Sequence, residues 1–113
     1  RRDFKELFSN LYNEGVKSVV FAGADESAEI AYLSLQEFDI RFAGIVDIER
    51  AGKDFFKHEI MPFEKLKDLS ADFVILTSFL KTDETYRKII EQGVKASKIK
   101  SIFPDSYRNS GSS

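Results

Sequence analysis

Apolar residues along this chain alternate between strand-like runs and helix-like spacing. Short runs rich in β-branched and aromatic residues predict five strands, at 16–22, 40–47, 58–62, 71–78 and 98–103. Apolar residues that recur every three or four positions predict helices over 3–14, 25–37, 63–69 and 82–93. The run ADFVILTS is the most apolar of the strands, which is typical of a central strand buried on both faces. This alternation predicts an α/β domain.

Residues at the helix ends agree with these limits. Asp3 and Thr82 are predicted to cap the first and the last helix, because their side-chain oxygens can accept hydrogen bonds from backbone N–H groups there. Gly15 and Gly93 are expected to end the same two helices, since glycine readily adopts the backbone conformation that stops a helix.

The order of the elements predicts a Rossmann-like three-layer sandwich. We expect a mostly parallel sheet of five strands in the spatial order 3-2-1-4-5, with helices on both faces. Residues 1–105 are expected to form this domain. Residues 106–113 are expected to be a disordered tail, because they are polar and low in complexity. The helix at 3–14 lies outside the minimal sheet unit, so it either covers the sheet or links the domain to a preceding one.

The turn after the first strand is the first candidate site. In dinucleotide-binding folds this turn has the pattern G-x-G-x-x-G/A, and here Gly23 and Ala28 fit the first and third positions while Asp25 occupies the second. A carboxylate roughly 4 Å from a phosphate is unfavourable by about 4 kcal/mol at an effective dielectric constant near 20. Two interpretations stay open: a phosphate-binding turn that includes Ala24, or a turn in which Asp25 caps the following helix.

Polar residues follow two further strands. Asp47 ends the second strand, near the spacing expected for the acid that binds a ribose 2′-hydroxyl, and an acid there favours NAD or a plain nucleotide over NADP. Thr77 and Ser78 end the central strand and are candidates for hydrogen bonds to a ribose or sugar, and Lys81 for a phosphate contact. The alternatives are that Asp47 stabilises a loop and that the other three residues precede a capped helix.

Composition and charge exclude several classes of function. The formal net charge of −2, without a block of like charges, argues against direct nucleic-acid binding. The absence of cysteine excludes disulfides and thiolate sites, and no pattern of ligands predicts a metal. His58 is the only histidine and has no nucleophile at a recognisable spacing, so no catalytic residue is predicted. No apolar run approaches the roughly 18 residues of a membrane helix, and we expect a cytoplasmic protein.

These motifs give the chain a resemblance to a known family. The segment VKSVVFAGADESAEIAYLSLQEFDIRFAGIVD, followed by HEIMPFEKL and ADFVILTS, is similar to small Rossmann-like domains found near nucleotide-sugar and polysaccharide-biosynthesis proteins. It most resembles the Rossmann-like domain fused behind a MarR-type winged helix in bacterial transcriptional regulators. The resemblance covers residues 3–104 and implies binding positions at Gly23, Ala24, Ala28 and Asp47, together with an upstream domain. Asp25 departs from the glycine of the family pattern.

The sequence therefore predicts a non-catalytic module that binds or senses a nucleotide, a nucleotide-sugar or a related metabolite for a longer bacterial regulator. NAD and a nucleotide-sugar are the candidate ligands, and Asp25 weakens both. One alternative is a fragment of an NAD-dependent or nucleotide-sugar-processing enzyme with its catalytic residues elsewhere. Another is a ligand-free module that forms a homodimer.

Overall fold

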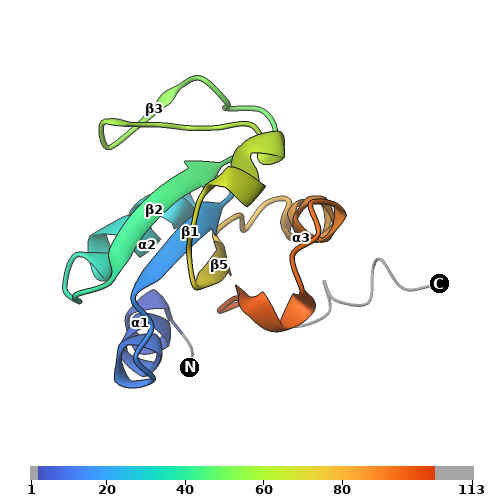
Figure 1. Ribbon diagram of the computed structural model, residues 1–113. Coiled ribbons are helices and arrows are strands. Elements are labelled where there is room, and N and C mark those ends of the chain that lie inside the picture. The colour runs from blue at the N-terminus through green and yellow to red at the C-terminus, as the bar shows by residue number, and fades with distance from the viewer. Residues whose placement is uncertain (1–2, 104–113) are drawn as a thin grey trace.

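The computed structural model describes residues 3–103, and at their centre is a parallel sheet of four strands. Its spatial order is β2-β1-β5-β6 (Figure 1). The bounds are Ser18–Ala22 for β1, Arg41–Val46 for β2, Phe73–Leu76 for β5 and Ile99–Lys100 for β6. Every residue of β1 is buried, as expected for an apolar strand with neighbours on both sides and helices on both faces.

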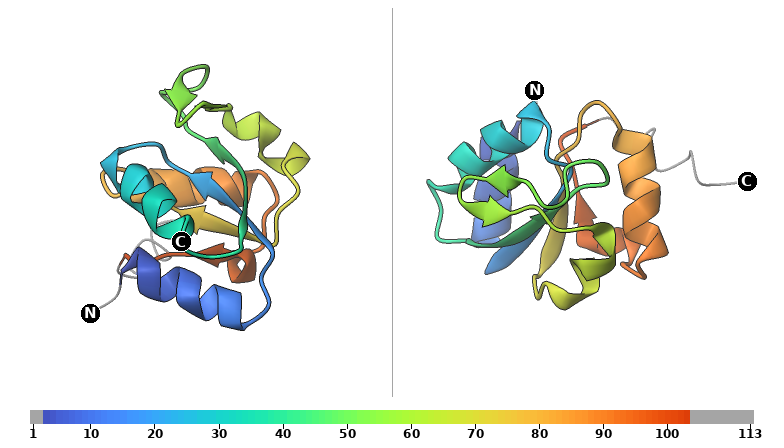
Figure 2. Two further views of the ribbon diagram at one scale, coloured as in Figure 1. Left: turned by 90° about the vertical axis from the view of Figure 1, so that its left-hand side faces the viewer. Right: turned by 90° about the horizontal axis from the view of Figure 1, so that it is seen from above.

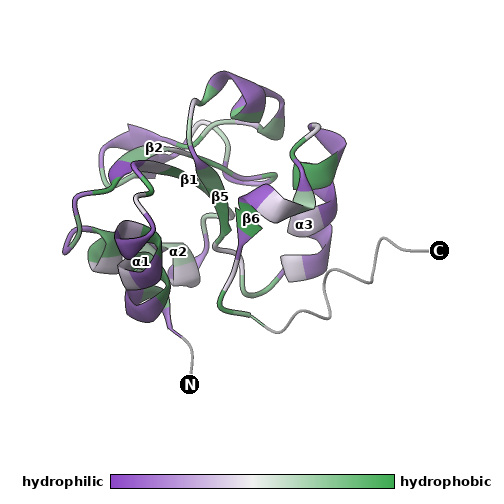
Figure 3. Ribbon diagram, turned by 60° about the horizontal axis from the view of Figure 1, so that its bottom comes forward, coloured by the Kyte–Doolittle hydropathy of each residue, from purple (hydrophilic) through white to green (hydrophobic). Residues whose placement is uncertain are grey.

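Helices cover both faces of this sheet (Figure 2). On one side lie α1 (Phe4–Asn13) and α2 (Glu26–Leu35), and on the other lie α3 (Thr82–Glu91) and the 3₁₀ helix η1 (Phe63–Asp68). A second 3₁₀ helix, η2 (Ala96–Lys98), leads into β6. The strands are the most apolar part of the fold, while the helices turn polar residues outwards (Figure 3). The predicted α/β layering is therefore confirmed.

The predicted five-stranded order is not confirmed. Residues His58–Glu59 form β4, which pairs with β3 (Asp54–Phe55) in an antiparallel hairpin separate from the main sheet. Phe56 and Lys57 between these strands have positive φ angles of 48° and 70°, so the chain reverses direction at once. The predicted third strand reaches the main sheet only through one parallel bridge between Val46 and Met61, on the outer side of β2. Pro62 follows directly and has no N–H group with which to extend that pairing.

The helix ends agree with the sequence at most positions. Asp3 caps α1 by accepting a hydrogen bond of 2.8 Å from the Glu6 N–H group, and Gly15 and Gly93 have positive φ angles just after α1 and α3. The predicted cap at Thr82 is wrong, because Thr82 is the first residue of α3 and its hydroxyl donates to the Ser78 carbonyl. The predicted tail lies outside the described residues.

Phenylalanine side chains join α1 to the sheet. The rings of Phe8 and Phe21 are stacked with centroids 6.2 Å apart, and both side chains are fully buried. Phe4 lies on the same face of α1 and contacts the rings of Phe8 and Phe103. Burying a side chain of this size stabilises a fold by roughly 1.5–3 kcal/mol. The helix at 3–14 therefore covers the sheet, as one of the two interpretations predicted.

Candidate functional site

The predicted site residues meet at one edge of the sheet. We call this the carboxyl edge, because β1, β2 and β5 all end there. Hydrogen bonds join residues that the chain separates by 23 to 55 positions across this edge. In open α/β sheets the ligand crevice lies at such an edge, where successive crossovers leave a strand in opposite directions. Here that point lies between β1 and β5. The residues brought together are Gly23, Ala24, Asp25, Ala28, Asp47, Thr77 and Ser78.

Gly23 lies in direct contact with the end of β5. Its φ angle is +107°, and a Cβ atom added to it would lie 2.4 Å from the Cβ atom and 2.6 Å from the backbone nitrogen of Ser78. The buried hydroxyl of Thr77 donates to the carbonyl of Gly23 at 2.7 Å and is also 3.1 Å from the Ala22 carbonyl. The glycine is therefore required by the close approach of the β5 end, and Ser78 lies against its open side.

Asp25 links the start of α2 to the loop between β5 and α3. One carboxylate oxygen accepts the Ser27 N–H at 3.0 Å, which makes Asp25 the N-cap of α2, one of the two interpretations that the sequence left open. The other oxygen accepts the N–H groups of Phe79 at 2.9 Å and Leu80 at 3.3 Å, and the Ser78 hydroxyl lies 3.4 Å from it. We call this set of bonds the Asp25 link. It adds to the contacts of Gly23 and Thr77 that hold these two segments together at the carboxyl edge.

Asp47 has a similar internal role. Its Oδ2 atom accepts the buried N–H of Ala24 at 2.7 Å, and its Oδ1 atom accepts the N–H groups of Glu49 and Arg50 at 2.8 and 3.0 Å. The Arg50 guanidinium lies 3.7 Å from Oδ2. A carboxylate with these partners stabilises the turn after β1 and the loop after β2 at the same time. Asp47 therefore stabilises a loop, as one of the two interpretations of this residue predicted.

Three backbone donors of the glycine turn and the start of α2 are already used. The N–H of Gly23 donates to Val46, that of Ala24 to Asp47 and that of Ser27 to Asp25. A phosphate bound at a helix N-terminus needs such N–H groups to be free to donate to it. The negative charge of the Asp25 carboxylate at this turn would also repel a pyrophosphate. These residues therefore do not fit the pyrophosphate of a dinucleotide.

The space at this edge is small. The hollow lined by Asp25, Asp47, Ser78 and Lys81 has a volume of about 90 Å³. Pockets that enclose drug-sized ligands have roughly 300–1,000 Å³. A second hollow of about 370 Å³ lies beside it at the start of α3, and the two share Leu80 and Lys81. Only a ligand much smaller than a dinucleotide, or one that extends into the second hollow, can be accommodated.

Charged side chains at the rim are paired with one another. The ammonium group of Lys81 forms a salt bridge with the Glu49 carboxylate. This hydrogen bond to Glu49 is the main cause that raises the pKa of Lys81 above its ordinary value, and the charges of Glu49, Glu84 and Asp47 act in the same direction. Lys81 therefore stays protonated at neutral pH and, with Arg50, brings positive charge to a rim that also holds Asp25, Asp47 and Glu49.

Sequence reasoning missed several residues of this edge. Glu49 and Arg50 belong to a segment that looks like a solvent loop, yet both N–H groups bind Asp47. The Ser78 hydroxyl accepts the Lys81 N–H at 3.2 Å and so supports the start of α3. The sequence placed Ser78 at this edge without that contact, and the contact between Asp25 and Phe79 leaves no trace in a local pattern.

His58 belongs to a different part of the molecule. Its ring lies edge-on to Phe42, with centroids 4.8 Å apart, and 6.0 Å from the ring of Tyr32. Phe55 and Phe56 of the hairpin contact the same tyrosine. The histidine is therefore part of an aromatic cluster between the β3–β4 hairpin, β2 and α2, where it has a packing role.

Comparison of the chain with protein-family models, with curated proteins and with solved structures found no match. Over residues 3–103, no group of three or more histidine, cysteine or acidic side chains is placed to hold a metal ion. In the same part of the chain, no helix has both the length and the apolar character that crossing a membrane requires.

Proposed function

We propose that this chain is a non-catalytic Rossmann-like module that acts as the regulatory part of a longer bacterial transcriptional regulator. In this proposal its carboxyl edge binds the nucleoside or sugar part of a nucleotide-type metabolite, and not a dinucleotide. The observation that carries the proposal is the meeting of polar side chains from three separate loops at the switch point of the sheet. These side chains are Asp25, Asp47, Ser78 and Lys81.

The chemistry of this edge suits hydroxyl groups. Carboxylate oxygens that accept two or three hydrogen bonds retain capacity to accept a ribose or sugar hydroxyl, and Asp47 stands where this fold usually places its ribose-binding acid. Lys81 supplies a cation between the two hollows, where it would offset the negative charge of a monophosphate or a nucleotide-sugar. Arg87, which lines the second hollow, adds another.

Thermal unfolding of the protein with adenosine, AMP, UDP-glucose and NAD tests this proposal. A ligand at about a hundred times its dissociation constant adds about 2.7 kcal/mol to the free energy of unfolding. For a domain of this size that corresponds to roughly 10 °C in Tm. We expect AMP or UDP-glucose to raise Tm, and NAD to raise it no more than AMP does. Amide chemical shifts should move at Ala24, Asp47 and Ser78.

Two lysine variants on the same helix region provide the control. Lys81→Gln should reduce the rise in Tm, because it removes the cation between the hollows. Lys88→Gln makes the same chemical change at a lysine that pairs with Glu91 and lines neither hollow, so it should leave the rise unchanged. If none of these compounds changes Tm, the proposal is wrong.

A second candidate function is a ligand-free interaction module. It is favoured by large apolar side chains exposed around the closed edge: Leu80 is 77% exposed, Phe79 63% and Ile48 41%. Sedimentation at increasing concentration would detect a homodimer. Leu80→Asp should abolish that dimer if this edge forms it, whereas Leu33→Asp, at an exposed position on α2, should leave it intact.

A further inference from the structure

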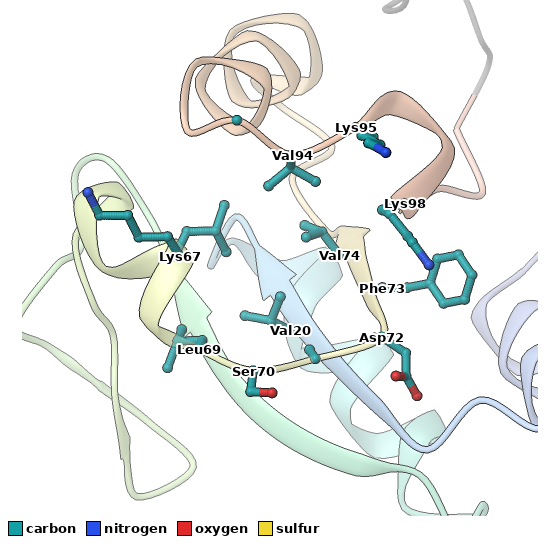
Figure 4. A pocket seen from close by; sticks show the side chains of 13 residues that line it. Val20, Lys67, Leu69, Ser70, Asp72, Phe73, Val74, Val94, Lys95 and Lys98 are labelled. Carbon is teal, nitrogen blue, oxygen red and sulfur yellow. The ribbon is translucent and has the colours of Figure 1, made fainter.

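A larger cleft lies on the α3 face of the sheet, away from the carboxyl edge (Figure 4). We call it the η1–η2 cleft, because η1 forms one wall and the segment from α3 to η2 forms the other. Its volume is about 470 Å³, within the range of roughly 300–1,000 Å³ found for small-molecule sites. It shares no lining residue with the hollow at the carboxyl edge.

The cleft exists because the crossover from β2 to β5 is unusually thin. The chain makes this crossover with a short hairpin and a six-residue 3₁₀ helix, where a parallel crossover usually contains a full α-helix. The thin crossover leaves a hollow between the two walls on this face, although the strand residues beneath it are themselves buried. Val20 of β1 and Val74 of β5 form the floor of the cleft between the two walls.

Two walls of the cleft carry half-buried apolar side chains among polar ones. Leu69 contributes to one wall and Val94 to the other, so an inserted group would contact hydrocarbon on two sides. Contact with apolar surface stabilises a bound apolar body by roughly 25 cal/mol per Å² removed from water. This part of the site suits an aromatic or branched aliphatic group.

Three lysines surround the apolar side chains of the cleft. Lys67 comes from η1, Lys95 from the connection after α3, and Lys98 from η2. Within residues 3–103, none of their ammonium groups has a carboxylate within 4.0 Å. The Lys98 ammonium group lies 5.1 Å from the centre of the Phe73 ring, which holds it beside the cleft.

The one acidic residue that lines the cleft offsets only part of the charge of these three lysines. The Asp72 carboxylate accepts the N–H groups of Lys17 and Ser18, at 2.7 and 3.3 Å, so it is engaged with the start of β1. The cleft consequently combines apolar side chains with a positive rim. A ligand with an apolar body and a negative end would satisfy both parts.

We propose that the η1–η2 cleft binds small amphipathic anions. The apolar body lies between Leu69 and Val94, above Val20 and Val74, and a carboxylate, sulfonate or phosphate group binds one or two of the lysines Lys67, Lys95 and Lys98 at the rim. This site is independent of the nucleotide-type ligand proposed for the carboxyl edge. Its occupant is a small molecule, because the volume of the cleft is of ligand size.

Anilinonaphthalene sulfonate is a suitable probe, since it joins an aromatic body to one sulfonate. We expect saturable one-to-one binding by fluorescence, with amide shift changes at Val20, Val74 and Val94. The triple variant Lys67→Gln, Lys95→Gln, Lys98→Gln should bind the probe about tenfold more weakly, given roughly 0.2–1 kcal/mol for each exposed ionic contact. Added salt should weaken the binding of the probe, and the binding of neutral phenylnaphthylamine should respond little.

The matched control is Lys53→Gln, Lys57→Gln, Lys88→Gln, which changes the net charge equally at three lysines outside the cleft. It should bind the probe as the unmodified protein does. Equal weakening in both triple variants would overturn the proposal, because general charge would then explain the binding. Shift changes centred on Ile48 and Leu80 would overturn it as well, because the probe would then occupy the carboxyl edge.

Discussion

The carboxyl edge and the η1–η2 cleft present opposite arrangements of charge and space. At the carboxyl edge the acids Asp25 and Asp47 bind backbone N–H groups of the protein itself, and about 90 Å³ is left open. In the cleft about 470 Å³ lies over an apolar floor, and the surrounding lysines have no carboxylate partner among the described residues. Open α/β sheets usually bind ligands at the carboxyl edge. In this protein, more polar groups are hydrogen-bonded within the protein at that edge than in the cleft.

This difference shows that a sheet can have the edge at which ligands usually bind while the polar groups at that edge bind one another. A polar group buried without a partner costs roughly 1–3 kcal/mol, so a turn that has no phosphate to bind gains stability when a side chain takes the N–H groups. Asp25 and Asp47 do this at the carboxyl edge. Exposed lysines bear no such cost, because water solvates them.

The largest expected effect comes from Gly23→Ala, which would break the contact between β1 and β5. The added Cβ atom would lie 2.6 Å from the backbone nitrogen of Ser78, and the φ angle of +107° is strained for alanine. We expect a loss of about 3 kcal/mol or more in the free energy of unfolding, measured with urea.

Gly93→Ala is the control for this prediction. Gly93 has a φ angle of +88° and nothing within 4 Å of an added Cβ atom, so its replacement should cost only about 1 kcal/mol of backbone strain. Equal losses in the two variants would mean that the contact with Ser78 contributes nothing, and the carboxyl edge would then be less tightly closed than the geometry indicates.

A smaller effect is expected when the Asp25 link is removed. Asp25→Ala takes away an N-cap and also leaves the N–H groups of Phe79 and Leu80 without their acceptor, so we expect a loss of about 2 kcal/mol. Asp3→Ala is the matched variant, because Asp3 caps α1 through Glu6 alone, and it should cost about 1 kcal/mol. Urea unfolding of both proteins gives the comparison. If Asp3→Ala costs as much, Asp25 is only a cap.

The smallest effect concerns the ion pair of Lys81 with Glu49 at the exposed rim. The pKa of Lys81 in the folded state lies above its pKa in the unfolded chain. The interaction of Lys81 with Glu49 therefore stabilises the fold below about pH 10.4, the ordinary lysine pKa. That contribution is lost as the pH rises through the folded-state pKa. A pH titration of the Lys81 side-chain NMR signals should show the raised pKa. Glu49→Gln should lower it towards the ordinary value, and an unchanged pKa in that variant would contradict the pairing.

Local patterns in the sequence were sufficient to predict the α/β layers of this fold. Strands, helices and several helix ends follow from periodicity, capping residues and glycines, because these depend on neighbours within a few positions. The sequence also placed Gly23, Asp25, Asp47, Thr77 and Ser78 at one edge, since the carboxyl ends of parallel strands meet there. The exception was the segment 58–62, where a reversal at Phe56 and Lys57 replaced a sheet strand with a hairpin.

Only the tertiary structure decided what those residues do. The sequence left Asp25 either at a phosphate site or as a cap, and its bond to the Phe79 N–H joins positions 54 residues apart. No local pattern records such a contact, because it depends on how β1 and β5 are paired. The sequence did not predict the cleft either, because Lys67, Lys95 and Lys98 line one cleft only when η1 and η2 flank the same two strands. The sequence by itself determined which elements form, and the packing of those elements determined which polar groups were left for a ligand.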